Sequence, residues 1–151
     1  MSLQEIVFGF CVSVILGAML GCNFAKVETL APVVGTVKVQ GKPLTLGWIT
    51  FYPDEARGNT RARLPLAEIT TDGTYELTTN GKPGAPPGFY KVVIAATRDV
   101  IPVRPPRTQD GKPAPPIWLT HEKYTKPQST DLLIEVVENP VPGAYDLEVS
   151  K

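Results

Sequence analysis

Several residue types that build common functional sites are scarce in this chain of 151 residues. It has one His and two Cys, which exclude a multi-His metal centre and a disulfide-rich scaffold. Fifteen basic residues balance fifteen acidic ones, which argues against a nucleic-acid binder that works by bulk electrostatics. No stretch of the body has a sustained apolar period of 3.6, so α-helices are not expected there. The length allows one domain with a real core, or at most two small ones.

The longest uncharged run lies at the N-terminus, over residues 6–25. Its apolar part, residues 6–20, has the length of a signal-peptide core and is short for a membrane span, which needs about 20 residues. The run ends in Met19-Leu20-Gly21-Cys22, which resembles a bacterial lipobox. We therefore expect residues 1–21 to be a lipoprotein signal peptide and Cys22 to be lipidated. An uncleaved anchor helix or an ordinary secretory signal is the alternative, since no Lys or Arg precedes the run.

The cysteine count fits lipidation. Cleavage removes Cys11 and lipidation consumes Cys22, so the mature chain has no free thiol or disulfide in an oxidising compartment. The acyl chains would hold the protein at a membrane, because each buried CH₂ contributes about 0.8 kcal/mol. Residue 23 is Asn rather than the Asp of an inner-membrane retention signal. The expected location is therefore the cell envelope, at the outer membrane on its periplasmic or surface face.

The body of the chain alternates short β-type runs with turn residues. Pro and Gly make up about 19% of the chain, against an average of roughly 12%. After a tether over residues 22–31, alternation predicts seven strands at 33–39, 46–52, 66–70, 74–78, 89–96, 132–137 and 145–149. Asp72-Gly73 is typical of a tight hairpin turn. The pattern predicts an all-β domain over residues 32–151, a seven-stranded antiparallel β-sandwich of transthyretin-like or Ig-like type. Its expected core is Val37, Ile49, Phe51, Tyr75, Leu77, Tyr90, Val92, Ile94, Ile134, Val136, Tyr145 and Leu147.

One long segment does not fit a minimal sandwich. Residues 98–130, here called the arm, hold seven prolines, and loops beyond about 15 residues are usually functional or disordered. Aromatic residues are scarce in disordered segments, so we expect Trp118 and Tyr124 to pin the arm to the body. Residues 121–124 can form one helical turn. The alternative is a floppy connection. The candidate binding residues are Arg98, Arg104, Arg107, Trp118 and Tyr124.

Five short motifs occur in order along the body. They are Val34-Gly35-Thr36-Val37, Gly41-Lys42-Pro43-Leu44, Ile49-Thr50-Phe51, Thr71-Asp72-Gly73-Thr74-Tyr75 and Pro86-Pro87-Gly88-Phe89-Tyr90-Lys91-Val92. With the lipobox, they resemble the carboxypeptidase regulatory-like, transthyretin-like domain of small planctomycete-type lipoproteins. Lys123-Tyr124 followed by Ser129-Thr130-Asp131-Leu132 is also similar to a segment of those proteins. The resemblance covers about residues 31–149. It implies a seven-stranded sandwich, a lipid anchor and no known catalysis, and it supplies no ligand.

Few residues of this chain are suited to catalysis. A related hydrolase of hydroxyisourate uses two His, an Arg and a C-terminal Tyr-Arg-Gly-Ser, whereas this chain has only His121 and ends in Ser150-Lys151. We expect no catalytic residue, no metal and no cofactor, and we expect His121 to be exposed or in a helical turn. The six Arg lie in two loops, one holding Arg57, Arg61 and Arg63 and the other Arg98, Arg104 and Arg107. Because successive strands alternate in direction, these two loops should emerge at opposite ends of the sandwich. A single anion-binding patch of all six Arg would therefore require the arm to fold back along the sandwich.

Three functions compete. The first is a non-catalytic, lipid-anchored binding or structural module that acts on envelope polysaccharide, peptidoglycan or protein. The second is a subunit of an envelope enzyme complex, which a cleft joining His121 to Asp131 or Glu122 would favour. The third is a transthyretin-like carrier of a small ligand, which outward apolar strand residues such as Trp48, Tyr52 and Phe89 would favour. The sequence does not give the oligomeric state.

Overall fold

The protein is all-β in a computed structural model that describes residues 29–98 and 107–151. The signal-peptide segment and Cys22 lie outside these residues. Two short 3₁₀ turns, η2 (Glu55–Arg57) and η3 (Glu122–Thr125), are the helical elements of the described part. None of its helices is long and apolar enough to cross a membrane.

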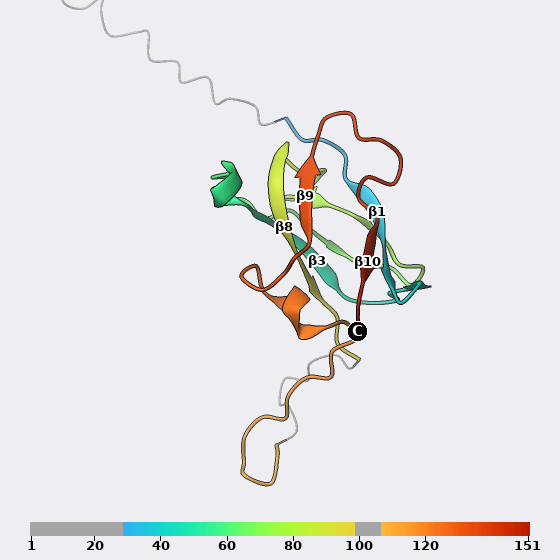
Figure 1. The fold of residues 1–151 in the computed structure, drawn as a ribbon, viewed down its shortest axis with the longest axis vertical. Helices are drawn as coiled ribbons and strands as arrows, with labels where there is room; N and C mark the ends of the chain where they lie inside the picture. Colours follow the sequence, from blue (N-terminus) through green and yellow to red (C-terminus); the bar gives the residue numbers. More distant parts are fainter. Residues whose placement is uncertain (1–28, 99–106) are drawn as a thin grey trace, which may run out of the picture.

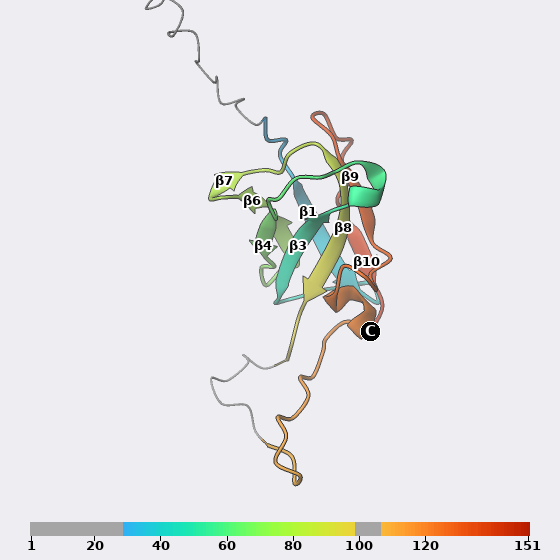
Figure 2. The same ribbon diagram turned by 90° about the vertical axis from the view of Figure 1, so that its left-hand side faces the viewer.

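The strands form two sheets, which Figures 1 and 2 show from two sides. In one sheet β1 lies between β10 and β2 and also pairs with β5, and the other has the order β7-β6-β4-β3-β8-β9. The strands are β1 (Val34–Val39), β2 (Lys42–Pro43), β3 (Trp48–Pro53), β4 (Leu66–Glu68), β5 (Thr74–Glu76), β6 (Thr78–Thr79), β7 (Lys82–Pro83), β8 (Gly88–Ala95), β9 (Leu133–Val136) and β10 (Leu147–Val149). All seven expected strand regions therefore contain strand, and the two-residue strands β2 and β7 are additional.

The hydrophobic core draws side chains from both sheets. All the expected core residues are buried except Ile134 and Leu147, which are half-buried and pack against the core. Phe51 lies at its centre, with its ring 5.7 Å from that of Tyr90 and 6.4 Å from that of Tyr75. The alternation of β3 is confirmed, because Ile49 and Phe51 are fully buried while its other side chains are exposed or half-buried.

The expectation of a purely antiparallel arrangement is wrong at β10, which runs parallel to β1. After β9 the chain crosses to the other sheet instead of turning back in a hairpin, and it enters beside β1 in the same direction. Two carboxylates hold it there. Asp146 accepts hydrogen bonds from the Thr36 amide and hydroxyl at 2.8 and 2.9 Å, and Glu148 accepts one from the Gly41 amide at 2.7 Å.

The Asp72-Gly73 turn forms, but it does not join two neighbouring strands of one sheet. The Thr70 amide donates to the Thr74 carbonyl, and Gly73 has the positive φ of 84° that the turn needs. The strand that follows then divides between the two sheets, since β5 pairs with β1 and β6 pairs with β4. The expected hairpin is therefore a connection that changes sheet.

The tether is shorter than expected at its C-terminal end. Ala31 is buried, and its amide and carbonyl exchange hydrogen bonds of 2.8 and 2.9 Å with Ala85. The described chain begins at one end of the body, in blue in Figure 1, beside the loop 137–146. The described residues of the arm lie at the opposite end in both ribbon views (Figures 1 and 2).

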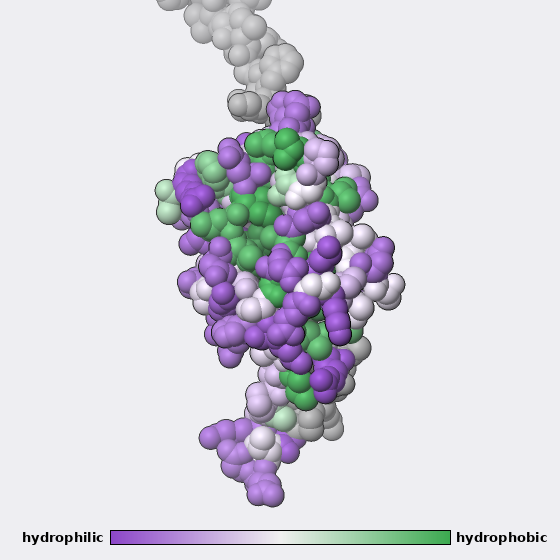
Figure 3. All heavy atoms as spheres, turned by 45° about the vertical axis from the view of Figure 1, so that its right-hand side comes forward, coloured by the Kyte–Doolittle hydropathy of each residue, from purple (hydrophilic) through white to green (hydrophobic). Residues whose placement is uncertain are grey.

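Exposed apolar residues occur near the end where the chain begins. Val34 at the start of β1 is 59% exposed, and Val141 in the loop 137–146 is 72% exposed. On the face shown in Figure 3, hydrophobic side chains gather in the upper part of the body, whereas the tip of the arm is hydrophilic. The arm tip is therefore polar, although Ile117 at the base of the arm is 54% exposed.

Candidate functional site

The base of the arm is paired to the end of β8. Leu119 donates its amide to the Ala96 carbonyl at 2.9 Å, and Arg98 donates its amide to the Ile117 carbonyl at 3.0 Å. Trp118 lies between these two bonds, in an antiparallel bridge with Thr97, and its side chain is half-buried. Leu119 packs against the core. The arm is thus paired to the body at Trp118 through the backbone, so the floppy alternative is wrong at this point. A pinning role of the Trp118 side chain itself stays a prediction.

Tyr124 fixes the returning part of the arm. It is buried in η3, which occupies the expected helical turn, and its hydroxyl lies 3.3 Å from the Ser150 hydroxyl. His121 precedes the turn as its N-cap, because its Nδ1 accepts a hydrogen bond from the Lys123 amide at 3.1 Å. His121 is exposed, as expected. Since Tyr124 belongs to the core, it positions the arm and offers no exposed contact.

An ion pair lies beside this turn. Lys123 Nζ donates to Asp131 Oδ2 at 2.7 Å, and this bond is the main reason why the pKa of Lys123 is raised and that of Asp131 lowered. Burial raises the pKa of Tyr124, but its hydrogen bonds with Ser150 and the nearby Lys123 outweigh burial and leave that pKa below its ordinary value. Both charged groups face solvent, so the pair contributes little to stability.

The tip of the arm is a closed turn. Arg107 and Pro113 form an antiparallel bridge, the Thr108 amide donates to the Lys112 carbonyl at 2.8 Å, and the Thr108 hydroxyl donates to Asp110. The Asp72 turn has the same two contacts, since Thr70 donates its amide to the Thr74 carbonyl and its hydroxyl to Asp72. The bond from the Thr108 hydroxyl is the main cause that lowers the pKa of Asp110. The arm therefore presents an ordered tip rather than a loose end.

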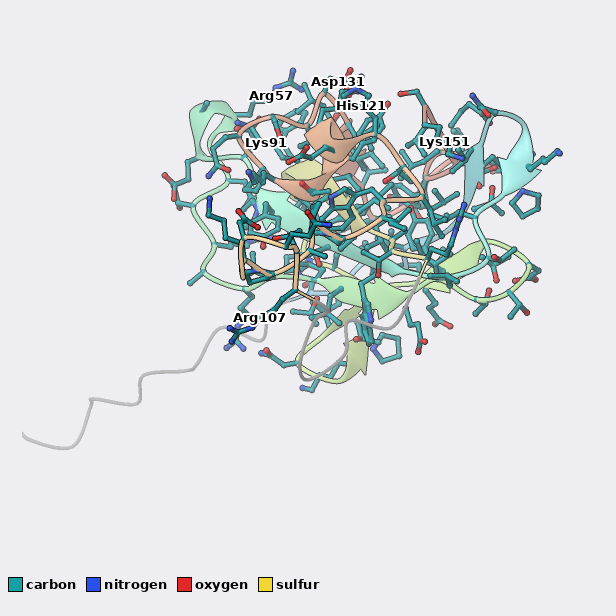
Figure 4. The ribbon with its side chains drawn as sticks, turned by 90° about the horizontal axis from the view of Figure 1, so that it is seen from below. Arg57, Lys91, Arg107, His121, Asp131 and Lys151 are labelled. Atoms are coloured by element: carbon teal, nitrogen blue, oxygen red, sulfur yellow. The ribbon has the colours of Figure 1, made fainter. Side chains whose placement is uncertain are left out.

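The structure separates the two Arg groups. Arg57 and Arg107 lie on different sides of the molecule in Figure 4, and η2 and the arm lie far apart along the body in Figure 1. Arg98 and Arg107 are exposed at the arm, and Arg104 lies outside the described residues. The described arginines do not form the single patch that a folded-back arm would give.

Sequence reasoning missed two buried polar residues after β3. The Asp54 carboxylate is buried, with Arg57 Nε at 3.6 Å and Lys91 Nζ at 4.0 Å. Asn59 is also buried, and its Nδ2 donates to the Phe89 carbonyl at 2.8 Å. Beside them is an open hollow of about 420 Å³, lined by residues 57–61 and 87–89. The spacing of Asp54 and Arg57 hints at the ion pair, but no sequence pattern marks Asn59.

A cleft joining His121 to Asp131 or Glu122 would favour the enzyme subunit. Asp131 lies near enough that the charge of His121 contributes to the lowering of its pKa, and Figure 4 shows the two residues close together. Neither residue lines the hollow, and Glu122 does not line it either. Residues 29–98 and 107–151 contain no group of three His, Cys, Asp or Glu side chains that could hold a metal ion.

Comparison with protein-family models, with curated proteins and with solved structures finds no match for this chain. No relative therefore supplies a fold family or a function, and the geometry of the described residues is what bears on both.

Proposed function

We propose that this chain is a lipid-anchored, non-catalytic binding or structural module of the bacterial cell envelope. Its body is a β-sandwich of the carboxypeptidase regulatory-like, transthyretin-like kind, and its arm makes contact with a partner. The observation that carries the proposal is the placement of the two ends. The described chain begins at one end of the body, seven residues after Cys22, and the arm projects from the opposite end (Figures 1 and 2).

This placement suits presentation away from a membrane. A chain anchored through Cys22 enters the body near the start of β1, where Val34 is exposed, and beside the loop 137–146, which carries the exposed Val141. The hydrophilic tip of the arm then faces away from the bilayer. Loops on a rigid scaffold commonly carry binding residues, and the prolines of this arm reduce the entropy that it loses on ordering. The partner is an envelope polysaccharide, peptidoglycan or a protein.

The anchor is tested by mass spectrometry of membrane-purified protein. We expect an N-terminal lipidated Cys22, and we expect Cys22→Ala to release the chain or to stop its maturation. Intact residues 1–21 in mature material would contradict lipidation and favour the uncleaved anchor helix. Crosslinking in the native envelope, followed by identification of the captured molecules, tests the partner.

The orientation is tested with single fluorescent labels on the lipidated protein in vesicles. Because the mature chain has no free thiol under this proposal, Thr29→Cys and Gln109→Cys each introduce one labelling site, at the body end and at the arm tip. Spin-labelled lipids should quench the label at position 29 more strongly than the label at position 109. Equal quenching, or stronger quenching at the arm, would contradict the orientation.

A second candidate is a transthyretin-like carrier of a small ligand. It is favoured by the outward apolar residues of the larger sheet, where Trp48 is 52% exposed and Leu66 and Leu133 are also exposed. A carrier needs an assembly that encloses such a face. Sedimentation of the detergent-solubilised protein distinguishes the candidates, since a stable tetramer or dimer that loses its assembly on Trp48→Ser would favour the carrier. A monomer would favour the module.

A further inference from the structure

The last strand of the larger sheet, β9, has one open edge. It ends the order β7-β6-β4-β3-β8-β9, and among the strands of the described chain it pairs only with β8. The Leu132 carbonyl accepts a hydrogen bond of 2.9 Å from the Val92 amide, and alternate residues of an antiparallel strand bond to the same neighbour. Ile134 therefore also bonds to β8, whereas the amides and carbonyls of Leu133 and Glu135 point to the open side.

The four strands that end the two sheets differ in how well they resist a further strand. β2 and β7 are two residues long, and each consists of Lys and Pro. Proline has no amide hydrogen to donate, and lysine at an edge opposes strand addition. β10 has three residues, whereas β9 has four and contains neither Pro nor Lys. The edge of β9 is therefore the one best suited to accept a peptide strand.

Apolar surface accompanies this edge. Leu133 and Val137 are exposed. Ile134 on β9 and Leu147 on β10 face the core but are only half-buried. β9 and β10 lie along one side of the body in Figure 2, and the chain between them is held by the Tyr145 hydroxyl, which accepts from the Val137 amide at 3.2 Å. A strand added to β9 would thus remove apolar surface from water.

The chain along this edge is acidic. Residues 127–150 contain no Lys or Arg, but they contain Asp131, Glu135, Glu138, Asp146 and Glu148. Lys123 pairs with Asp131, and Asp146 and Glu148 accept backbone hydrogen bonds from the smaller sheet. Glu135 and Glu138 are exposed, and within the described residues neither forms an ion pair. The two carboxylates therefore favour a basic partner.

We propose that the open edge of β9 accepts an extended peptide segment of a partner protein in which basic and apolar residues alternate. The peptide backbone bonds to Leu133 and Glu135. Its basic side chains lie on the outer face beside Glu135, and its apolar side chains cover Ile134 and Leu147. A second copy of this chain is a poor occupant, because it brings the same acidic edge and like charges oppose strand pairing. This contact does not depend on the lipid anchor or on the arm.

Three synthetic peptides with blocked ends provide the probes. The first is a short peptide of alternating Lys and Val. The second has Glu in place of Lys, and the third has Pro in place of Val, which keeps the charge but loses amide donors. Each is titrated into the full mature chain in neutral detergent micelles, and amide NMR signals and amide hydrogen exchange are measured.

The Lys-Val peptide should cause saturable shifts along β9. It should also slow the exchange of the Leu133 and Glu135 amides, which face the open side. The Ile134 amide faces β8 already, so its exchange should change less. The Glu-Val and Lys-Pro peptides should bind more weakly, because one has the wrong charge and the other cannot extend the sheet.

A proline at position 133 tests the backbone contact. Leu133→Pro removes an outward amide and leaves the bonds of Leu132 and Ile134 to β8 in place, so it should weaken binding of the Lys-Val peptide by roughly fivefold or more. Leu133→Ala keeps the amide and should retain most of the affinity. If Leu133→Pro does not fold, the exchange of the Leu133 and Glu135 amides in the wild type decides the question.

A double variant tests the charge contact. Glu135→Gln with Glu138→Gln should weaken binding of the Lys-Val peptide by roughly fivefold. Glu55→Gln with Glu68→Gln removes the same charge from exposed positions on η2 and β4, and it should leave the affinity unchanged.

Four results would overturn the proposal. They are the absence of saturable shifts with the Lys-Val peptide, equal binding of the Glu-Val or the Lys-Pro peptide, equal affinity in the two double variants, and self-association through β9. Self-association would appear as slow exchange of the Leu133 and Glu135 amides without peptide, in proportion to protein concentration, and it would assign the edge to a second copy.

Discussion

The hydroxyl of Tyr75 donates a 2.6 Å hydrogen bond to the carbonyl of Tyr145, and this bond joins β5 to the segment that leads into β10. Both residues are buried. Gly35 lies against the bond, since a Cβ at that position would come within 2.3 Å of the Tyr145 carbonyl oxygen. The segment before the last strand is therefore held beside β1 by a buried contact between residues 70 positions apart in the sequence.

Removal of the Tyr75 hydroxyl tests this contact. Tyr75→Phe leaves the buried Tyr145 carbonyl without its donor, which costs about 1–3 kcal/mol of unfolding free energy. The ring is retained, so no large cavity forms. Tyr52→Phe is the matched control, because Tyr52 is only half-buried and should change stability by less than about 0.5 kcal/mol. Urea denaturation measures both, and equal stabilities would contradict the role of the bond.

The same hydroxyl predicts a pH dependence. Burial, and secondarily the charge of Asp146, raise the pKa of Tyr75 above its ordinary value of 10.0. The hydroxyl of Tyr75 therefore loses its proton at a lower pH in the unfolded chain than in the folded protein. The free energy of unfolding keeps its full value below pH 10 and declines as the pH rises above it. The free energy of unfolding should fall less steeply above pH 10 in Tyr75→Phe than in the wild type. Parallel curves would contradict the prediction.

Alanine substitutions at Gly73 and Gly41 distinguish the cost of backbone strain from the cost of side-chain crowding. Both have positive φ, at 84° and 77°, so an alanine at either position meets a strain of roughly 1–2 kcal/mol. A Cβ at Gly73 would also lie 2.9 Å from both the Val37 carbonyl oxygen and Pro43 Cβ, whereas one at Gly41 meets nothing within 4 Å. Gly73→Ala should therefore cost about 1–3 kcal/mol more than Gly41→Ala in denaturation experiments. Similar losses would show that crowding is unimportant.

Local pattern predicts where strands lie but not which sheet they join. Residues 74–78 alternate as one strand, yet their two halves pair with β1 and β4. The split depends on contacts with strands far away in the sequence, which periodicity does not encode. The parallel β10 was missed for the same reason, because its direction is set by the crossing from one sheet to the other and by Asp146 and Glu148.

One short sequence motif occurs twice and forms the same structure each time. Gly-Lys-Pro occurs at residues 41–43 and 81–83, and each copy follows a residue with positive φ, Gln40 or Asn80, and forms a two-residue strand. Pro normally weakens a strand assignment, so the alternation pattern does not predict these two short strands. The hollow was also missed, because Asn59 and Asp54 become buried only when the loop closes on Phe89, which lies 30 residues beyond Asn59.

Truncation of Phe51 tests the centre of the core. Phe51→Ala removes a fully buried ring that contacts both Tyr75 and Tyr90, and it should cost about 3–5 kcal/mol. Total stability is about 5–15 kcal/mol for a domain of this size, so the loss is a large fraction of it and the variant should unfold at a much lower temperature than the wild type. Leu133→Ala is the exposed control and should change little. Thermal unfolding followed by circular dichroism provides the measurement.

Deletion of residues 102–116 tests the arm without touching its base. The bonds from Arg98 to Ile117 and from Leu119 to Ala96 lie outside the deletion, so the body should keep its melting temperature. If the arm binds the partner, capture by crosslinking is lost. If the arm instead only packs against the body and stabilises it, the deletion lowers the melting temperature and capture stays proportional to the amount of folded protein. That result would contradict the proposed function.

Neutralising the three arm arginines tests whether partner binding depends on the positive charge of the arm. Arg98→Gln, Arg104→Gln and Arg107→Gln leave the backbone bonds of the arm in place, so the fold should persist. A charge contact in the partner complex should weaken in this triple variant and, in the wild type, at high salt, because exposed charges are screened beyond about 8–10 Å at physiological ionic strength. Equal capture by the wild type and the triple variant at low and high salt would rule out the charge contact. Binding would then rest on the half-buried Trp118 and on the ordered tip that the Thr108 turn holds closed.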